Sequence, residues 1–314
     1  MTTRNRGQEE RMELDFVKMH GAGNDFIFID DLSEDRELSV EQVRFLCDRH
    51  VGIGADGVIL VRPSGQTDCV AYMHYINDDG SLAEMCGNGV RCFAKYLVDR
   101  GFVAAGEGRL VADTLAGRRV ISFETDADGM LTQATVDMGE PAFEPQRIPT
   151  TLEANSTVAG KPAVVEAELS GPSPLSTPLR FTCVNMGNPH AVAFPEGDES
   201  VIRTLDWGGQ GRELEHHPAF PERANIELAR VIRPGSAEED AEIEMRVWER
   251  GVGETLACGT GACATAVAAV VTGRAARRAV VHLPGGDLRI EWLENNHVMM
   301  TGPATTVYEG TILL

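Results

Sequence analysis

Two cysteines in this sequence stand in the same local context. Cys86 begins the segment Cys-Gly-Asn-Gly, and Cys258 begins the segment Cys-Gly-Thr-Gly. Each segment leads into a predicted helix, whose first amides lack partners within the helix and carry partial positive charge. A thiol at this position is expected to have a lowered pKa and to act as a base. Both cysteines are therefore candidates for acid–base chemistry.

The glycine-rich turns after the cysteines can also bind an anion. The amides of Gly87, Asn88, Gly259 and Thr260 suit a carboxylate, because the glycines let a ligand approach the backbone closely. Such a cradle would stabilise the charge that develops when the neighbouring α-proton leaves. Inverting that carbon needs one group that removes a proton and another that returns one to the opposite face. Two flanking cysteines, one thiolate and one thiol, supply this pair.

Other uses of the cysteines fit the sequence less well. A zinc site would need compact ligand pairs, and the cysteine spacings do not provide them. A thiol nucleophile could pair with His190, but that interpretation leaves the second cysteine unexplained. We interpret the remaining five cysteines as structural, because free cysteine is commonly buried; they are Cys47, Cys69, Cys92, Cys183 and Cys263.

The two cysteine segments belong to an internal repeat. Residues 74–94 align without gaps on residues 246–266 at an offset of 172, which sets the two cysteines opposite each other. At an offset of 164, Gly-Asn-Asp-Phe (23–26) lies opposite Gly-Asn-Pro-His (187–190). Repeated units of this kind indicate duplicated supersecondary structure. We expect two similar domains that face each other across a pseudo-twofold axis.

Helices must follow both cysteines if these ideas hold. Val90, Phe93, Ala94 and Leu97 have helical spacing, which predicts a helix from Cys86 to a C-terminal cap at Gly101. The small, apolar segment GACATAVAAVV predicts a second, buried helix that opens near Gly259 and stops at Gly273.

The rest of the chain alternates short strands with turns. A capping box at Ser39 predicts a helix that buries Val43, Leu46 and Cys47, and another helix is expected near 199–206. Strands are expected at 57–62, 69–76, 109–138, 224–233 and 241–249. We expect residues 1–12 to form a disordered extension and residues 150–178 to form a surface excursion with little fixed structure.

Composition limits the class of protein. The 314 residues carry a formal charge of −20, a field that argues against binding nucleic acid or an anionic membrane surface. No apolar run is long enough for a transmembrane helix. An odd number of thinly spread cysteines suits a reducing cytoplasm. At this length two domains are expected.

Seven motifs, including both cysteine segments, extend across the chain: KMHGAGNDF (18–26), RHVGIGAD (49–56), NDDGSLAEMCGNGVRC (77–92), NMGNPHAV (185–192), FPERANIE (220–227), WERGVGETLACGTGACA (248–264) and LPGGDLRIEW (283–292). In this order they resemble the diaminopimelate epimerase family over residues 13–314. Some members carry Gln where this chain has Gly57, so we assign no site there.

The resemblance implies a site and an activity. Cys86 and Cys258 match the family's proton-transfer pair, with His190 and Glu249 beside them. Substrate contacts are implied for Asn24, Asn77, Gly87, Asn88, Asn188, Asn225, Glu249, Arg250, Gly259 and Thr260. The implied reaction interconverts L,L- and meso-diaminopimelate, in lysine and peptidoglycan-precursor biosynthesis, with no cofactor and no metal.

The resemblance also implies the fold and assembly. It implies an α+β fold of two pseudo-symmetric domains, each a curled, mostly antiparallel sheet around a central helix. We expect residues 13–131 plus 303–314 to form one domain and residues 132–302 to form the other, with the site in the cleft between them. A homodimer is implied. Two alternatives stay open: a proline racemase-like enzyme with two cysteines, and a binding protein without activity.

Overall fold

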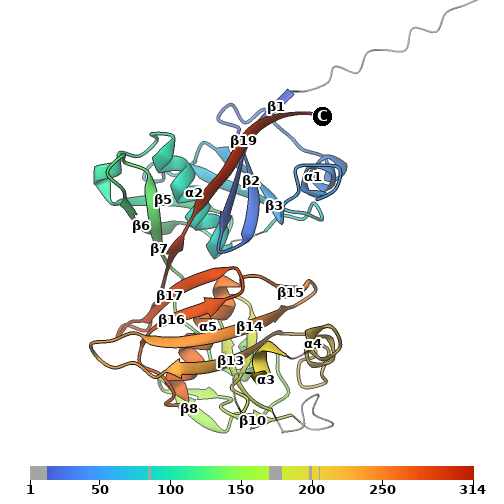
Figure 1. The fold of residues 1–314 in the computed structure, drawn as a ribbon, viewed down its shortest axis with the longest axis vertical. Helices are drawn as coiled ribbons and strands as arrows, with labels where there is room; N and C mark the ends of the chain where they lie inside the picture. Colours follow the sequence, from blue (N-terminus) through green and yellow to red (C-terminus); the bar gives the residue numbers. More distant parts are fainter. Residues whose placement is uncertain (1–12, 84–85, 170–178, 198–199, 205) are drawn as a thin grey trace, which may run out of the picture.

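The computed structural model describes most of the chain, namely residues 13–83, 86–169, 179–197, 200–204 and 206–314. Figure 1 shows two lobes stacked along the long axis and joined near β7 (Leu131–Asp137) and β18 (Val298–Pro303), which pair antiparallel. The last strand, β19 (Thr305–Leu313), returns to the first lobe and pairs with β1 (Glu13–Gly21).

The first lobe is a mostly antiparallel sheet with two parallel pairs, β2–β3 and β4–β5. Its strands after β1 are β2 (Asn24–Asp30), β3 (Gly57–Arg62), β4 (Tyr72–Asn77), β5 (Arg109–Thr114), β6 (Arg119–Thr125) and β7. Parallel neighbours need a crossover connection. The crossovers contain the helices α1 (Val40–Cys47) and α2 (Gly87–Asp99), the second followed by the short η1 (Ala105–Glu107).

The second lobe repeats this plan. Its main strands are β11 (Arg180–Asn185), β12 (Pro189–Ala193), β13 (Asn225–Arg233), β14 (Ala241–Glu249), β16 (Arg278–Leu283), β17 (Gly286–Trp292) and β18. The parallel pairs are β12–β13 and β14–β16, at the places that correspond to those of the first lobe. The crossovers contain α3 (Ser200–Arg203) and α4 (Trp207–Glu215) in the first case, and α5 (Gly259–Val271) in the second.

The predicted repeat is present in the helices themselves. α2 and α5 each contain 13 residues, and both their first and last residues are related by the offset of 172. Each helix packs inside its own lobe, with Phe93 of α2 and Val267 of α5 fully buried in one continuous core. The expected fold class, two pseudo-symmetric α+β units with mostly antiparallel sheets around a central helix, is confirmed.

Smaller helices cover the outer side of each sheet. α1 begins with the predicted capping box, in which Ser39 Oγ accepts from the Gln42 amide and the Gln42 side chain accepts from the Ser39 amide. It buries Val43, Leu46 and Cys47 as predicted. In the second lobe, α4 packs Trp207 and Leu214 into the corresponding outer core.

Two expectations for the second lobe need correction. The segment 150–178 contains fixed structure: the hairpin β8 (Ser156–Val158) with β9 (Lys161–Ala163), and β10 (Ala167–Glu168), which pairs with β11. Pairing with neighbouring strands outweighs the weak local pattern. The sequence also gave no sign of α4, because its glycines are poor helix formers, yet Asp206 caps it by accepting from the Gly208 amide at 3.1 Å.

Several elements outside these have simple outcomes. β15 (Gly253–Thr255) extends β14 as a hairpin, and η2 (Pro145–Arg147) follows β7. The expected extension at 1–12, residues 170–178, and parts of the helix expected near 199–206 lie outside the described residues. All seven cysteines are free. Four of the five interpreted as structural are buried, whereas Cys69 is half-buried in the turn before β4.

Candidate active site

Both candidate cysteines occupy the N-cap of a central helix. Cys86 precedes α2 and Cys258 precedes α5, each with extended backbone angles. Cys258 Sγ accepts a hydrogen bond from the Gly261 amide at 3.4 Å and lies 3.5 Å from Thr260 Oγ1. The amides of Asn88 and Gly89 act on the Cys86 sulfur in the same way. The expected setting at helix N-termini is therefore present at both cysteines.

The predicted effect on thiol pKa is wrong in its net direction. Burial raises the pKa of Cys86 and raises that of Cys258 well above the ordinary value for a cysteine. The Glu249 charge raises the pKa of both thiols further, and the helix amides lower it only in part. Desolvation of a charged sulfur outweighs the helix terminus here. Both cysteines consequently rest as thiols in the protein by itself.

The two helix N-termini lie against each other. A Cβ at Gly87 would meet Met300 Cε at 2.6 Å, and a Cβ at Gly259 would meet Met300 Sδ at 3.0 Å. The same Cβ at Gly259 would lie 3.5 Å from the Asn88 side-chain oxygen. The cradle residues of the two lobes thus converge around one methionine of β18, which is the arrangement that the repeat predicts.

Amide side chains surround Cys86. The thiol donates to Asn24 Oδ1 at 3.4 Å, and Asn88 Nδ2 donates to the same oxygen at 3.2 Å. Arg91, which is fully buried on α2, donates to Asn88 Oδ1 at 2.9 Å. Asn24 Nδ2 in turn donates to the Asp56 carboxylate at 2.5 Å. Two predicted contact residues, Asn24 and Asn88, are thereby joined to the first cysteine.

Acidic side chains surround Cys258. Glu249, at the end of β14, accepts a hydrogen bond from Thr255 Oγ1 at 2.5 Å and another from the Cys258 thiol. Burial raises the pKa of Glu249, which the two hydrogen bonds partly oppose. A carboxylate in this position can take the thiol proton. The two cysteines therefore have different partners, a neutral amide on one side and a carboxylate on the other.

His190 forms a buried chain beside α5. Its Nδ1 lies 2.6 Å from Glu227 Oε1 and its Nε2 lies 2.8 Å from Asn188 Oδ1. His190 and Glu227 are both fully buried, and Glu227 Oε2 has no hydrogen-bond partner. A Cβ at Gly261 would lie 2.9 Å from Glu227 Oε1, so this carboxylate reaches the first turn of α5. Burial raises the pKa of Glu227.

Three other predicted contact residues lie at strand ends. Asn225 pairs with His190 in the β12–β13 ladder, and its Nδ2 donates to the Pro189 carbonyl while its Oδ1 accepts from the Arg250 amide. The exposed Arg250 guanidinium donates to the Glu222 carbonyl at 3.4 Å. Asn77 ends β4 and donates to Ser81 Oγ at 3.0 Å. The hydrogen bonds join Asn225 to Arg250 but leave Asn77 in its own turn.

Four residues around the cysteines were absent from the sequence prediction: Asp56, Arg91, Glu227 and Thr255. Asp56 and Glu227 end two of the motifs, and Glu227 interrupts an apolar strand, which is an informative place for a charge. Arg91 interrupts the apolar side of α2 in the same way. These buried charges were visible in the sequence, but their partners lie on distant segments. Position 57 has no room for a side chain, because a Cβ would lie 2.6 Å from the Tyr75 ring.

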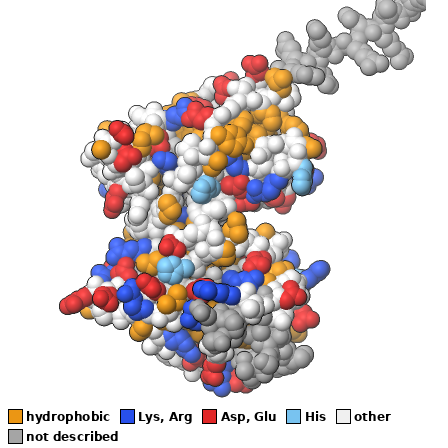
Figure 2. All heavy atoms as spheres, in the orientation of Figure 1, with side chains coloured by type: hydrophobic (Ala, Val, Ile, Leu, Met, Phe, Trp, Pro, Cys, Tyr) orange, Lys and Arg blue, Asp and Glu red, His pale blue; other side chains and the backbone are white. Residues whose placement is uncertain are grey.

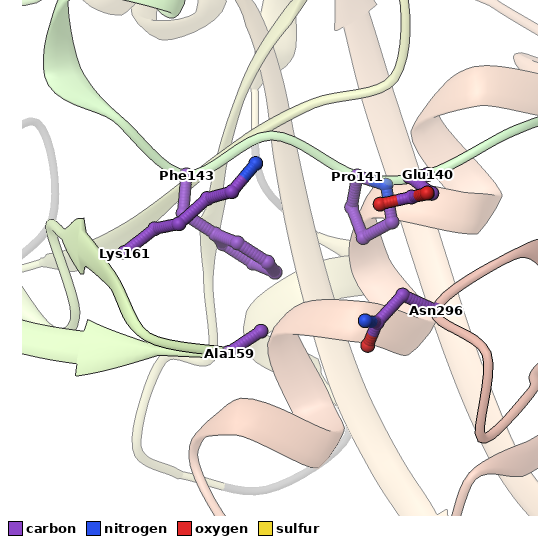
Figure 3. Close-up of a pocket in the computed structure, with 6 residues that line it drawn as sticks. All are labelled: Glu140, Pro141, Phe143, Ala159, Lys161 and Asn296. Carbon is purple, nitrogen blue, oxygen red and sulfur yellow. The ribbon is translucent and has the colours of Figure 1, made fainter.

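Features elsewhere are separate from this site. A pocket in the second lobe, shown in Figure 3, contains none of the predicted residues; it is lined by Glu140, Pro141, Phe143, Ala159, Lys161 and Asn296. Within the described part of the chain, no group of three His, Cys, Asp or Glu side chains is arranged to hold a metal ion. The helices found there are all too short or too polar to cross a membrane.

Comparison with solved structures supports the fold. A hydroxyproline epimerase from Agrobacterium vitis superposes with a TM-score of 0.62 at 14% identity, covering 98% of this chain and 94% of that one. A PhzF-family phenazine biosynthesis protein from Bacillus anthracis gives a TM-score of 0.61 at 14% identity, covering 96% of this chain and 100% of that one. At such identities the similarity extends to the fold alone.

Comparison of sequences is more specific. The family model described as diaminopimelate epimerase matches residues 16–144 and 182–307. A diaminopimelate epimerase of Thermosynechococcus vestitus is 48% identical over 313 residues, covering 96% of this chain and 100% of the relative. That of Desulfitobacterium hafniense is 45% identical over 303 residues, covering 96% and 98%. With both cysteine segments inside the matched residues, this chain belongs to the diaminopimelate epimerase family.

Proposed function

We propose that this protein interconverts L,L- and meso-diaminopimelate by a two-base reaction without a cofactor, in lysine and peptidoglycan-precursor biosynthesis. The observation that carries the proposal is the pair of cysteines at equivalent N-caps of two converging helices. The relatives at 45–48% identity are named diaminopimelate epimerases, which supports this substrate over proline. Proline-type enzymes enter the comparison only through a fold match at 14% identity.

In the proposed reaction, one cysteine removes the α-proton and the other returns a proton to the opposite face. We assign Cys86 as donor and Cys258 as acceptor in the L,L to meso direction, and the reverse roles in the other direction. Glu249 is suited to take the Cys258 proton, because it already accepts a hydrogen bond from that thiol. His190, held by Glu227 at 2.6 Å, acts on the same side of the site.

The substrate is expected to bind at both of its ends. The reacting carboxylate would bind the first amides of both helices, at Gly87, Asn88, Gly259 and Thr260, which also stabilise the charge formed on deprotonation. The distal amino-acid end carries an amine and a second carboxylate, which fit polar and charged side chains. We assign this contact to residues at strand ends and turns, namely Asn24, Asn77, Asn188, Asn225, Glu249 and Arg250.

Replacing each cysteine by alanine tests the two-base scheme. C86A and C258A should both lose at least about a thousandfold in epimerisation, because each removes one of two required proton-transfer groups. The assay follows conversion of L,L-diaminopimelate and uptake of solvent deuterium at the α-carbon. C183A is the matched control, since Cys183 is a buried thiol on β11 away from the helix N-termini. Near-normal turnover in either active-site variant would refute the scheme, and faster turnover of proline would refute the substrate.

We also propose the division of the chain and its assembly. The domains are residues 13–131 with 303–314, and residues 132–302, with the site in the cleft between them. A homodimer through the first domain is supported by β19, an edge strand that exposes Val307, Tyr308 and Leu313. Figure 2 shows hydrophobic side chains gathered on this lobe. Sedimentation should give twice the chain mass, and Y308E should give the monomer; a monomeric parent protein would contradict this.

We place the enzyme in the cytoplasm. Its proposed substrate belongs to biosynthesis of lysine and wall precursors, and its reaction needs reduced thiols. Both cysteines are free, as the reaction requires. Cell fractionation with detection of the protein would test the location, and recovery with secreted or membrane material would contradict it.

A further inference from the structure

Asp56 lies outside the proposed catalytic set yet contacts it. Its Oδ1 accepts from Arg49 at 2.7 Å, and its Oδ2 accepts from the Asp25 amide at 3.1 Å and from Asn24 Nδ2 at 2.5 Å. A guanidinium and a backbone amide can only donate hydrogen bonds. Both carboxylate oxygens of Asp56 are therefore committed as acceptors. The Asn24 amide has to turn its NH₂ group toward Asp56.

The other end of the chain of amides imposes the same direction. Buried Arg91 can only donate, so Asn88 turns Oδ1 toward it at 2.9 Å and presents Nδ2 to Asn24 Oδ1 at 3.2 Å. Two charges of opposite sign, Asp56 and Arg91, thus orient the amides between them. As a result, the Asn24 side chain presents its oxygen to Cys86 Sγ at 3.4 Å.

This orientation decides which form of Cys86 is stabilised. An amide oxygen accepts a hydrogen bond from a thiol, whereas it repels a thiolate. Cys258 lacks this restraint, because its sulfur accepts from the Gly261 amide and faces the Thr260 hydroxyl, which can donate. The asymmetry between the two halves of the repeat is therefore built into the side chains around each sulfur.

We propose that Asp56 is a positioning residue that, through Asn24, holds Cys86 in its thiol form as the proton donor of the resting enzyme. The inference rests on the proposed two-base function but concerns one thiol, so it is tested without substrate turnover. The charged and titratable groups that face this part of the site are Lys18, Asp25 and Arg49 around Asp56, and Tyr75, Arg91 and Glu249 around Cys86.

The test measures alkylation of Cys86 by iodoacetamide at pH 7.5, with peptide mass spectrometry to resolve each cysteine. The rate follows the fraction of thiolate. In D56N, an NH₂ group replaces one acceptor oxygen and Asn24 loses its fixed direction. Loss of one hydrogen bond that favours the thiol should speed alkylation of Cys86 by about tenfold. The rate at Cys258 in the same sample should stay within about twofold and serves as an internal reference.

A double-mutant cycle separates positioning from the loss of a negative charge. If Asp56 acts through Asn24, D56N should change the Cys86 rate by less than about twofold in an N24A background. An equal acceleration in both backgrounds would overturn the inference, because it would show a direct charge effect. An unchanged rate in D56N would overturn it as well. Epimerase activity of the parent protein is measured separately, so failure of the proposed function is recognised independently.

Two further variants guard the interpretation. D240N removes another carboxylate that pairs with an arginine, Arg289, far from the cysteines, and it should leave both alkylation rates unchanged. D56S also removes the carboxylate and replaces D56N if thermal unfolding shows that D56N is not folded. D56E, which keeps a carboxylate, should restore slow alkylation of Cys86. A fast rate in D56E with a folded protein would count against the need for an acceptor at this place.

Discussion

A methyl group at position 261 should damage the reaction more than the fold. Gly261 lies in the first turn of α5, directly above the candidate base. In G261A, the new Cβ would lie 2.9 Å from Glu227 Oε1 and 3.3 Å from Cys258 Sγ. Ordinary contact begins at 3.4 Å, so the neighbours must move by a few tenths of an ångström. Glu227 has little freedom to do so, because it is fully buried and bound to His190.

The expected magnitudes follow from this geometry. Alanine is favoured over glycine inside a helix by about 1 kcal/mol. Crowding of a packed interior costs about 1–3 kcal/mol. The free energy of unfolding should therefore fall by no more than about 2 kcal/mol when the two effects are combined. The catalytic rate is more sensitive, since a 1 Å misplacement can cost about a hundredfold, and we expect a loss of kcat of at least about tenfold.

The assay compares kcat and urea unfolding of G261A with those of G209A. Gly209 lies in α4, and a Cβ there would meet nothing within 4 Å. G209A should gain up to about 1 kcal/mol in stability and keep normal kcat. If G261A behaved like G209A in both measurements, Glu227 and Cys258 could not be crowded around this glycine. The account of the second half of the site would then be refuted.

Three further changes test the electrostatics. T255V removes the hydroxyl that lowers the pKa of Glu249, so the acid limb of the kcat–pH profile should move to higher pH by about one unit; an unmoved limb would contradict the role of this hydrogen bond. E227Q should lower kcat by about tenfold because His190 loses its carboxylate partner, and normal kcat over the whole pH range would argue against the pair. The hydrogen bond from Asp137 raises the pKa of His297, so this pair stabilises the fold below pH 6.5 and the benefit is lost as pH rises through the raised pKa. H297Q should therefore lose stability relative to the parent at pH 5.5 but little at pH 8.5, and parallel urea curves at both pH values would contradict it.

Most secondary structure near the cysteines was predictable from local pattern. The apolar spacing through Val90, Phe93 and Leu97 reports one buried face of α2, and a glycine follows close to its end. The capping box at Ser39 is also local, since both of its hydrogen bonds join residues three apart. Where structure depended on pairing with distant strands, as for β8 to β10, local composition was misleading.

The electrostatics of the site could not be predicted in the same way. The helix N-terminus is a local feature, so its attraction for a thiolate was correctly expected at both cysteines. Burial depends on everything packed around the sulfur, and it raises both thiol pKa values instead. Glu249 adds to this effect at both sulfurs, although it is 163 positions away from Cys86 in the sequence.

The sequence by itself determined that this protein has two equivalent cysteines, each before a glycine-rich helix start, because a duplicated segment remains readable as a repeat. It also determined the family, because the motifs around those cysteines are long and ordered. Only the tertiary structure decided how the two sulfurs differ. Asn24 with Asp56 faces Cys86, and Glu249 faces Cys258. These partners come from separate strands and turns, and only folding brings their charges within hydrogen-bond distance of the same site.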